Sequence, residues 1–361
     1  MASLAEQSNT ALDAHGGIQI SVAPLSESIK HLLTLDVLNH EIPFWQHPKW
    51  WQLANDTLFN GSVELVFVCD EQGNTLAALP IERLGGLLRS PKHAHLTVSD
   101  SIWCSTHTAE SINTIMDASL GHLNAWAWQC TNAPDYAEVR LCEDLPQWQW
   151  HEARESAWFD TSGDMPIPGK LRRNLSRHER NLESTHGAVQ YSVITNSDKD
   201  NLNNALKNFL ALEASGWKGE SGTAINTDPT LKAFYQGMAE LNDQYLQFEV
   251  HQMHMNDRCI ASQLAFRCGS TCYLLKICYD EEYANFSPGS LLLKHTMQSC
   301  VESDIKKLSL VSAPDWAMRW KPILIPVWHV TRFANTKQGN LRQKLIKAKR
   351  GVIHHLRDSR S

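Results

Sequence analysis

The sequence predicts a mixed α/β fold (α+β class) in two domains, and three observations support this prediction. The chain has 361 residues, whereas single domains usually contain about 100–200 residues. Strand-like and helix-like patterns alternate on both sides of a break at Ser156–Gly169, where two glycines and two prolines interrupt any regular pattern. Hydrophobic residues make up 42% and charged residues 20% of the chain, which excludes a largely disordered or fibrous protein.

The first half combines short strands with one clear helix. An apolar run at Val63–Cys69 and a second at Thr75–Ile81, which Pro80 is expected to end, predict two strands. The intervening residues 70–74 (DEQGN) are typical of a turn. Residues Ala109–Leu123 are predicted to be helical, because four apolar residues fall on one face: Ile112, Ile115, Met116 and Leu120.

The second half predicts a longer series of elements. In order they are a helix at Lys170–Glu183, a strand at Val189–Ile194, a helix at Asp198–Ser215, a loop at Gly216–Thr227, a helix from Asp228 to about Asn242, three strands at Leu246–Met255, Cys259–Arg267 and Thr271–Tyr279, a helix beginning at Ser287, strands at Lys307–Val311 and Ile323–Phe333, and a basic C-terminal helix. Asp228 and Pro229 supply an N-cap and a first-turn proline. Asn256-Asp257 and Gly269-Ser270 suit two-residue hairpin turns, so the three strands are expected to be antiparallel.

Charge is distributed unevenly around a formal net charge of −6. Residues 1–160 contain 7 Lys and Arg against 20 Asp and Glu, whereas residues 337–361 contain 8 basic residues against the single Asp358. The acidic first half argues against broad nucleic-acid binding through that half, and no DNA partner is expected.

The sequence also predicts a cytoplasmic protein without a membrane span or a metal. No uncharged apolar stretch approaches the about 20 residues that cross a bilayer, and the N-terminus has no apolar signal core. Nine cysteines without a pairing pattern indicate reduced thiols. The histidine pairs and cysteines lack the ligand spacing of metal sites, so no metal is expected.

Four stretches and the order of elements after residue 165 carry a family resemblance. The stretches are KLRRNLSRHERNLE (170–183), ASGWKGESGT (214–223), ASQLAF (261–266) and KICYDEEYANFSPGSLL (276–292). Together they resemble GNAT acetyltransferases of the bacterial type linked to cellulose biosynthesis, which are similar in architecture to the Fem aminoacyltransferases. The resemblance implies two tandem GNAT-like acyl-CoA N-acyltransferase domains, at 18–160 and 161–336, after a disordered N-terminus (1–17) and before a basic C-terminal helix (337–361).

The start of the predicted helix at Ser287 is the strongest local signal. Ser287 can cap the helix, Pro288 suits its first position, and Gly289 allows a ligand to approach the backbone closely. The free N–H groups of Gly289, Ser290 and Leu291 would then face outward and hold a pyrophosphate. In the GNAT family this turn binds acetyl-CoA, so acetyl-CoA or another acyl-CoA is the expected co-substrate. Here Ala284 stands where the family has Arg or Gln, and Ser287 replaces the first Gly; another acyl donor therefore stays open.

Acyl transfer to an amine also needs a base and stabilisation of an oxyanion. The resemblance places these functions near the end of the strand Thr271–Tyr279, with Asp280 as the first candidate base and Lys276 beside it. An ordinary surface Lys–Asp pair is the alternative. Glu213, at the end of the helix Asp198–Ser215, is a third candidate catalytic residue.

Acceptor-binding candidates lie in three other places. The resemblance places the loop with Trp217 and Lys218 over the acceptor site, and Gln263 on the middle strand is a further candidate. Arg172 and Arg173, just after the break between the halves, are candidates for gripping a polyanionic donor or acceptor. Each candidate has an alternative interpretation. Trp217 would only pack in the core, Gln263 would only hydrogen-bond buried backbone groups, and the arginines would belong to a solvated helix face.

The predicted function is an N-acyltransferase that acts on an amine of a sugar, amino acid or peptide, with the first half covering or positioning the acceptor. Two other interpretations stay open. A Fem-like enzyme would use aminoacyl-tRNA, held by the basic residues at 170–180 and in the C-terminal tail. A non-catalytic GNAT-like scaffold is the third, suggested by the departures at Ala284 and Ser287.

Overall fold

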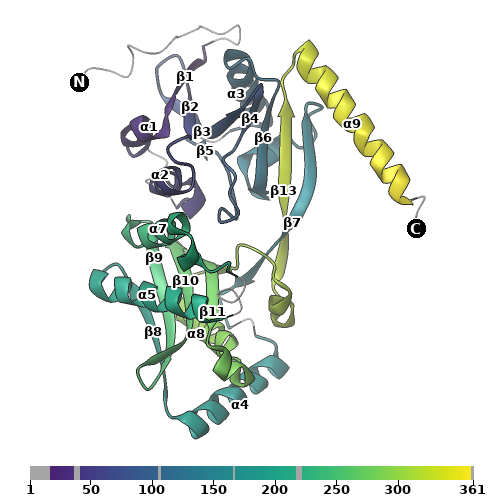
Figure 1. The fold of residues 1–361 in the computed structure, drawn as a ribbon. Coiled ribbons are helices and arrows are strands. Elements are labelled where there is room, and N and C mark those ends of the chain that lie inside the picture. Colours follow the sequence, from purple (N-terminus) through teal and green to yellow (C-terminus); the bar gives the residue numbers. More distant parts are fainter. Residues whose placement is uncertain (1–16, 36–40, 105–106, 166, 217–221, 359–361) are drawn as a thin grey trace. The chain divides into compact units, whose positions relative to one another are not determined.

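The computed structural model describes residues 17–35, 41–104, 107–165, 167–216 and 222–358, and it confirms the mixed α/β fold class (Figure 1). The described residues separate into two compact units. Unit 1 contains those of 1–37, 61–154 and 326–361, and unit 2 contains those of 38–60 and 155–325. Each predicted domain is one continuous stretch of the chain, whereas each of these units is made of two or three separate stretches. Of the predicted disordered N-terminus, only Gly17 lies among the described residues.

Unit 1 is built on a sheet with the strand order β1-β2-β3-β4-β6-β13, in which the short β5 pairs with β3. Its strands are β1 (Gln19–Pro24), β2 (Glu64–Cys69), β3 (Thr75–Leu84), β4 (Leu87–Arg89), β5 (Ile102–Trp103), β6 (Ala127–Pro134) and β13 (Ile323–Phe333), the last shared with unit 2. Its helices are α1 (Leu25–Leu32), α3 (Ala109–His122), the 3-10 helix η4 (Glu138–Cys142) and α9 (Lys337–Asp358). The predicted apolar stripe of α3 is buried in the core of this unit.

Pro80 does not end its strand, which corrects the sequence prediction: β3 continues to Leu84. On one side Pro80 pairs with Leu65 of β2. On the other side β5 pairs only with residues 77–78 and β4 only with 82–84. Because no described strand pairs with Pro80 there, its missing N–H removes no ladder hydrogen bond.

Unit 2 is built on a sheet with the strand order β7-β12-β11-β10-β9-β8. Its strands are β7 (Trp148–Asp160, shared with unit 1), β8 (Val189–Thr195), β9 (Leu246–Met255), β10 (Arg258–Cys268), β11 (Thr271–Tyr279) and β12 (Lys307–Ser309). Its helices are α2 (Pro48–Thr57), α4 (Gly169–His186), α5 (Lys199–Ser215), α7 (Pro229–Gly237) and α8 (Pro288–Glu302), with 3-10 helices η3 (Phe44–Gln46), η5 (Ile225–Thr227), η6 (Met238–Glu240), η7 (Glu281–Phe286) and η8 (Asp315–Trp320).

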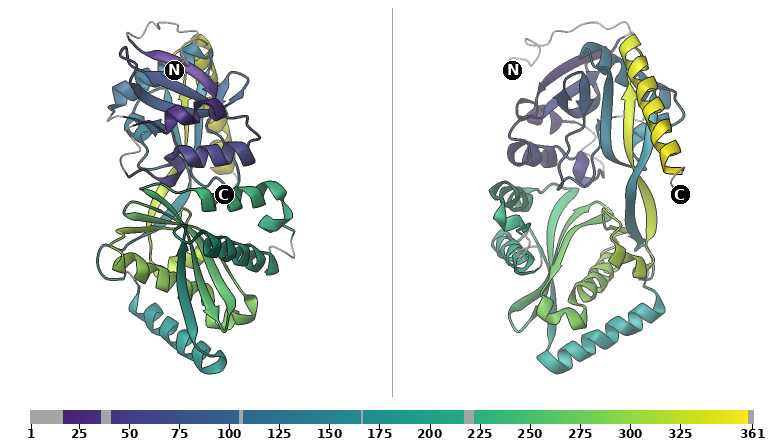
Figure 2. Two further views of the ribbon diagram at one scale, coloured as in Figure 1. Left: turned by 90° about the vertical axis from the view of Figure 1, so that its left-hand side faces the viewer. Right: turned by 45° about the vertical axis from the view of Figure 1, so that its right-hand side comes forward.

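Helices cover both faces of the unit 2 sheet, with α5 on one side and α8 on the other (Figure 2). Two neighbouring residues of β9 show this directly, because successive side chains of a strand point to opposite faces. The Gln252 side chain donates to the Ala205 carbonyl of α5, whereas His251 lies against Thr296 of α8. The strands between them are therefore buried on both faces.

The three central strands form the antiparallel hairpins that the sequence predicted. Asn256 and Asp257 adopt φ values of 47° and 61°, the left-handed pair that a two-residue turn needs. Gly269 has φ 52° in the second turn. The helix expected from Asp228 to about Asn242 is shorter: α7 ends at Gly237, a weak helix former, and continues only as the 3-10 turn η6.

No helix among the described residues is long and apolar enough to cross a membrane.

Candidate functional site

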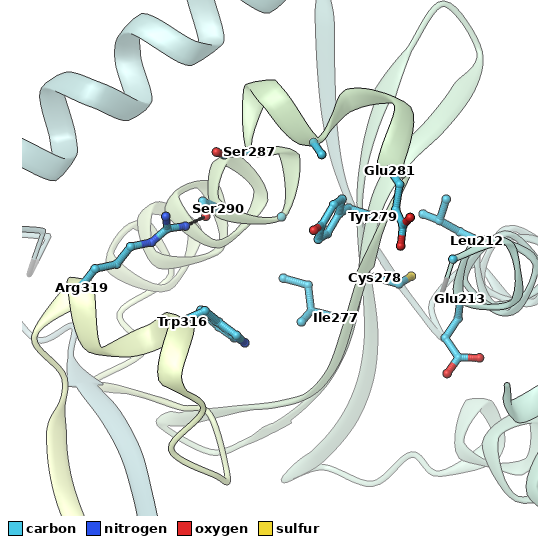
Figure 3. Close-up of a pocket in the computed structure, with 13 residues that line it drawn as sticks. Leu212, Glu213, Ile277, Cys278, Tyr279, Glu281, Ser287, Ser290, Trp316 and Arg319 are labelled. Atoms are coloured by element: carbon cyan, nitrogen blue, oxygen red, sulfur yellow. Dashed lines mark hydrogen bonds between the residues drawn. The ribbon is translucent and has the colours of Figure 1, made fainter. Parts of the chain in front are cut away.

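A cavity of about 520 Å³ lies in unit 2, where α5, β11, η7, α8 and η8 approach one another (Figure 3). It is lined by Leu212, Glu213, Gly216, Ile277, Cys278, Tyr279, Glu281, Ala284, Ser287, Gly289, Ser290, Trp316 and Arg319. Of the predicted site residues, the structure brings Glu213, Ser287, Gly289 and Ser290 together here.

One wall of the cavity is an open strand edge. β12 runs parallel to β11 but pairs only with Thr271–Tyr273. The register with β10 shifts between Leu264 and Ala265, so that Leu275 is an extra residue on β11. From residue 274 to 279 the outer edge of β11 has no partner strand among the described residues. Ile277 and Tyr279 of this stretch line the cavity, so a ligand there can approach the strand edge.

The start of α8 forms a second wall, although fewer of its amides are free than the sequence predicted. Ser287 adopts a left-handed conformation (φ 56°, ψ 52°), and its side chain makes no cap hydrogen bond. The N–H groups of Ser290 and Leu291 both donate to the Ser287 carbonyl, at 2.9 and 3.1 Å. Of the three N–H groups of Gly289, Ser290 and Leu291, only that of Gly289 donates to no acceptor among the described residues. Leu291 and Pro288 are buried and do not line the cavity.

Arg319 and Trp316 of η8 complete this end of the cavity, and sequence analysis missed both. The Arg319 guanidinium donates through Nη2 to the Ser290 hydroxyl (Figure 3). Arg319 is the only cation among the described residues that line the cavity. The sequence DWAMRW (315–320) forms the 3-10 helix η8, but this local pattern does not indicate which segment Arg319 contacts.

The opposite end of the cavity is acidic. Glu213 is buried, and its Oε2 accepts the Ile225 N–H at 3.0 Å. Burial and the nearby Glu213 charge raise the pKa of Tyr235. Glu281 lies at the same end, away from Arg319 (Figure 3). The cavity therefore has a cationic end and an anionic end.

Asp280 and Lys276 do not line the cavity. Asp280 Oδ2 pairs with Arg258 Nη2 at 2.5 Å, and its Oδ1 accepts the Glu282 N–H at 3.1 Å, which caps η7. Since its oxygens are engaged in these contacts, Asp280 positions the η7 turn. Lys276 lies opposite Leu264 in the β10–β11 pairing.

Gln263 belongs to a buried polar network beneath α8 and does not line the cavity. The Thr296 hydroxyl donates to Gln263 Oε1 at 2.8 Å and lies 3.2 Å from His251 Nδ1. The other ring nitrogen of His251 lies 3.0 Å from Glu249 Oε2, and Arg267 Nε lies 2.8 Å from Glu249 Oε1. The network joins β9 and β10 to the helix that carries the Ser287 turn.

This network predicts an acid-sensitive contribution to stability. Burial alone would raise the pKa of Glu249, but the hydrogen bond from His251 and the charges of His251 and Arg267 outweigh burial and lower it. Because the folded-state pKa lies below the ordinary 4.5, this stability is fully present above about pH 4.5 and is lost as the pH falls through the folded value. Glu249→Gln should therefore destabilise the protein at pH 7, and the difference from wild type should shrink on acidification.

Urea denaturation at several pH values measures the free energy of unfolding of both proteins, and hydrogen exchange in β9 and α8 locates the difference between them. Asp164→Asn, at an exposed carboxylate of the same unit, is the matched control and should leave the pH dependence unchanged. A pH-independent effect of Glu249→Gln would contradict the prediction.

The remaining predicted contacts lie elsewhere or outside the described residues. Arg172 donates through Nη2 to the carbonyls of Met165 and Ile167, and neither it nor Arg173 lines the cavity. Trp217 and Lys218 lie outside the described residues.

No group of three or more potential metal ligands occurs among the described residues. All nine cysteines are free thiols.

Comparisons with known proteins find a family match that covers this part of the chain. Residues 169–321 match the family model described as an acetyltransferase (GNAT) domain. This range contains α4 to η8 and therefore most of unit 2 and every residue that lines the cavity. No curated protein matches the sequence.

Three solved structures share the fold over most of the chain. The C-terminal domain of a putative lysylphosphatidylglycerol synthetase from Agrobacterium fabrum has a TM-score of 0.57 at 12% identity, over 89% of this chain and 96% of that one. FemX has a TM-score of 0.55 at 12% identity, over 88% and 97%. L-PGS from Bacillus licheniformis has a TM-score of 0.52 at 13% identity, over 84% and 95%. At such identities the likeness concerns the fold.

Proposed function

We propose that this chain, whose residues 169–321 form a GNAT-type acetyltransferase domain, is an N-acyltransferase that moves an acyl group from a thioester to an amine. One observation carries the proposal: the open edge of β11 and the start of α8 meet at a single cavity whose two ends have opposite charge (Figure 3). An acyl transferase needs two such ends, one for an anionic carrier and one for an amine.

The residues present fit an acyl-CoA donor. An extended arm with amide groups can pair with the free edge of β11 as an added strand does. A phosphate can lie against the Gly289 N–H and the Arg319 guanidinium. A side chain at position 289 would fill this space, because its Cβ would lie 3.3 Å from Tyr279 Cδ1. Acetyl-CoA or another acyl-CoA is therefore the proposed co-substrate, and no metal is proposed.

Glu213 is the proposed base in place of Asp280, because Glu213 lines the cavity and Asp280 does not. The cationic amine first passes a proton to the Glu213 carboxylate, and the neutral nitrogen then attacks the thioester carbonyl and forms a C–N bond. Backbone N–H groups at the cavity edge of β11, beside Ile277 and Tyr279, are the proposed donors to the oxyanion. The C–S bond then breaks, and the leaving sulfur takes up a proton as a thiol.

The proposed acceptor is an amine on a sugar, amino acid or peptide, in agreement with the family resemblance. The acidic end formed by Glu213 and Glu281 attracts the cationic form of such an amine. Nine free thiols favour a reducing compartment, so the cytoplasm is the proposed location.

Isothermal titration with acetyl-CoA and longer acyl-CoAs tests the proposal. Saturable binding to at least one of them, followed by release of free thiol when an amine is added, is the expected result. Absence of binding to every acyl-CoA would contradict the proposal and favour an aminoacyl-tRNA donor or a non-catalytic scaffold.

A second candidate donor, aminoacyl-tRNA, is favoured by one feature of α4. Four basic residues of α4 are exposed and lie three or four positions apart, so they share one face of the helix: Lys170, Arg173, Arg177 and Arg180. None of them forms an ion pair with another described residue. Such a stripe suits a phosphate backbone. Under this reading, RNA binding should weaken steeply with salt, and Arg173→Glu with Arg177→Glu should abolish it.

A further inference from the structure

We infer that Arg319 makes the cavity select acyl donors whose carrier bears phosphate groups. This inference rests on the proposed function and adds a specificity residue from outside the Ser287 turn. The turn itself carries no cation, because Ala284 stands at the position of the family's Arg or Gln. In three dimensions η8 brings Arg319 into contact with Ser290 of this turn.

The geometry of η8 explains why Arg319 points into the cavity. In a 3-10 helix, residues three apart share a face. Ala317 and Trp320 are fully buried in the core of unit 2 and anchor the helix. Trp316 and Arg319 share the next face, and both line the cavity. The buried face thus fixes the direction of the arginine.

The hydrogen bonds at the turn explain why a cation is needed there. The N–H groups of Ser290 and Leu291 are both engaged by the Ser287 carbonyl, so the turn itself offers few donors. An arginine provides five N–H donors and a permanent charge. The contact from Arg319 Nη2 to the Ser290 hydroxyl holds the guanidinium at the start of α8 and engages only one of its nitrogens.

The charge distribution makes this end selective. The other charged residues that line the cavity, Glu213 and Glu281, lie at the far end and repel an anion (Figure 3). A phosphate entering the cavity is therefore drawn toward Arg319. A carrier without phosphate gains nothing from this end.

The test compares the affinities of acetyl-CoA and S-acetylpantetheine, which lacks the phosphates and the nucleotide. Wild type should bind acetyl-CoA more tightly. Arg319→Gln should weaken acetyl-CoA binding about 30-fold and leave S-acetylpantetheine binding unchanged, since a charge-assisted hydrogen bond is lost only for the phosphate carrier. Arg319→Lys should recover part of the loss in acetyl-CoA affinity.

Lys321→Gln is the matched control, because Lys321 is an exposed cation two residues away that does not line the cavity. It should change neither affinity. Equal losses for both thioesters in Arg319→Gln would assign the arginine a structural role and overturn the inference. Equal binding of both thioesters by wild type would overturn the inference alone, whereas failure of wild type to bind either would overturn the proposed function as well.

Discussion

Replacing Glu213 with glutamine is expected to lower turnover about 100- to 1,000-fold without weakening acyl-CoA binding, the range usual for the loss of a positioned base. Glu213 is the buried carboxylate of the cavity, at the end opposite Arg319. Glutamine has the same shape and can still accept the Ile225 N–H, which now lies 3.0 Å from Oε2. The substitution therefore removes the proton acceptor and preserves the local fold.

Steady-state kinetics, combined with titration of the donor, separate these two effects. Glu240→Gln is the matched control. Glu240 lies on η6, is exposed and pairs with Lys199 of α5, so this substitution should not change turnover. An unchanged melting temperature of Glu213→Gln would show that the fold is intact. Full turnover in this variant would remove Glu213 from the mechanism.

Replacing Gly289 with tryptophan is expected to weaken donor binding at least about 100-fold, or about 2.7 kcal/mol. A Cβ at this position would lie 3.3 Å from Tyr279 Cδ1 and 3.4 Å from Ile277 Cδ1, and both residues line the cavity. A larger side chain must therefore enter the space beside the Ser287 turn. Gly289→Ala should have a smaller effect, because its neighbours need to shift by only a few tenths of an ångström.

Titration calorimetry with the acyl-CoA that wild type binds best measures this loss. Gly163→Trp is the matched control, because no heavy atom lies within 4 Å of a Cβ at that position. Donor binding by Gly289→Trp at wild-type affinity would mean that the carrier does not pass the start of α8.

The type and order of the α-helices and strands from α4 to β12 could be predicted from local patterns. The bounds of β9, β11 and the strand β13 agree with the predicted ranges, because apolar runs end at turn residues that the backbone requires. The cap of α7 by Asp228 was predicted correctly, since its side chain accepts the N–H groups of the residues two and three positions ahead.

The direction of a side chain on a central strand could not be predicted in the same way. Gln263 was a candidate for the pocket, yet it is bonded beneath α8. Helices cover both faces of this sheet, so both sets of alternating positions are buried and the pattern does not indicate the face. Asp280 shows a second limit of local patterns. Its partner Arg258 lies on β10, so no short stretch of sequence contains both residues of the ion pair.

By itself, the sequence determined the fold class and the Ser-Pro-Gly start of α8, because helix, strand and turn preferences act between near neighbours. Only the tertiary structure decided which charged groups meet at that turn. Arg319 and Ser290 are 29 residues apart, and the burial of Ala317 and Trp320 brings them into contact. Packing of distant segments set the chemistry of the cavity, and no local pattern records that packing.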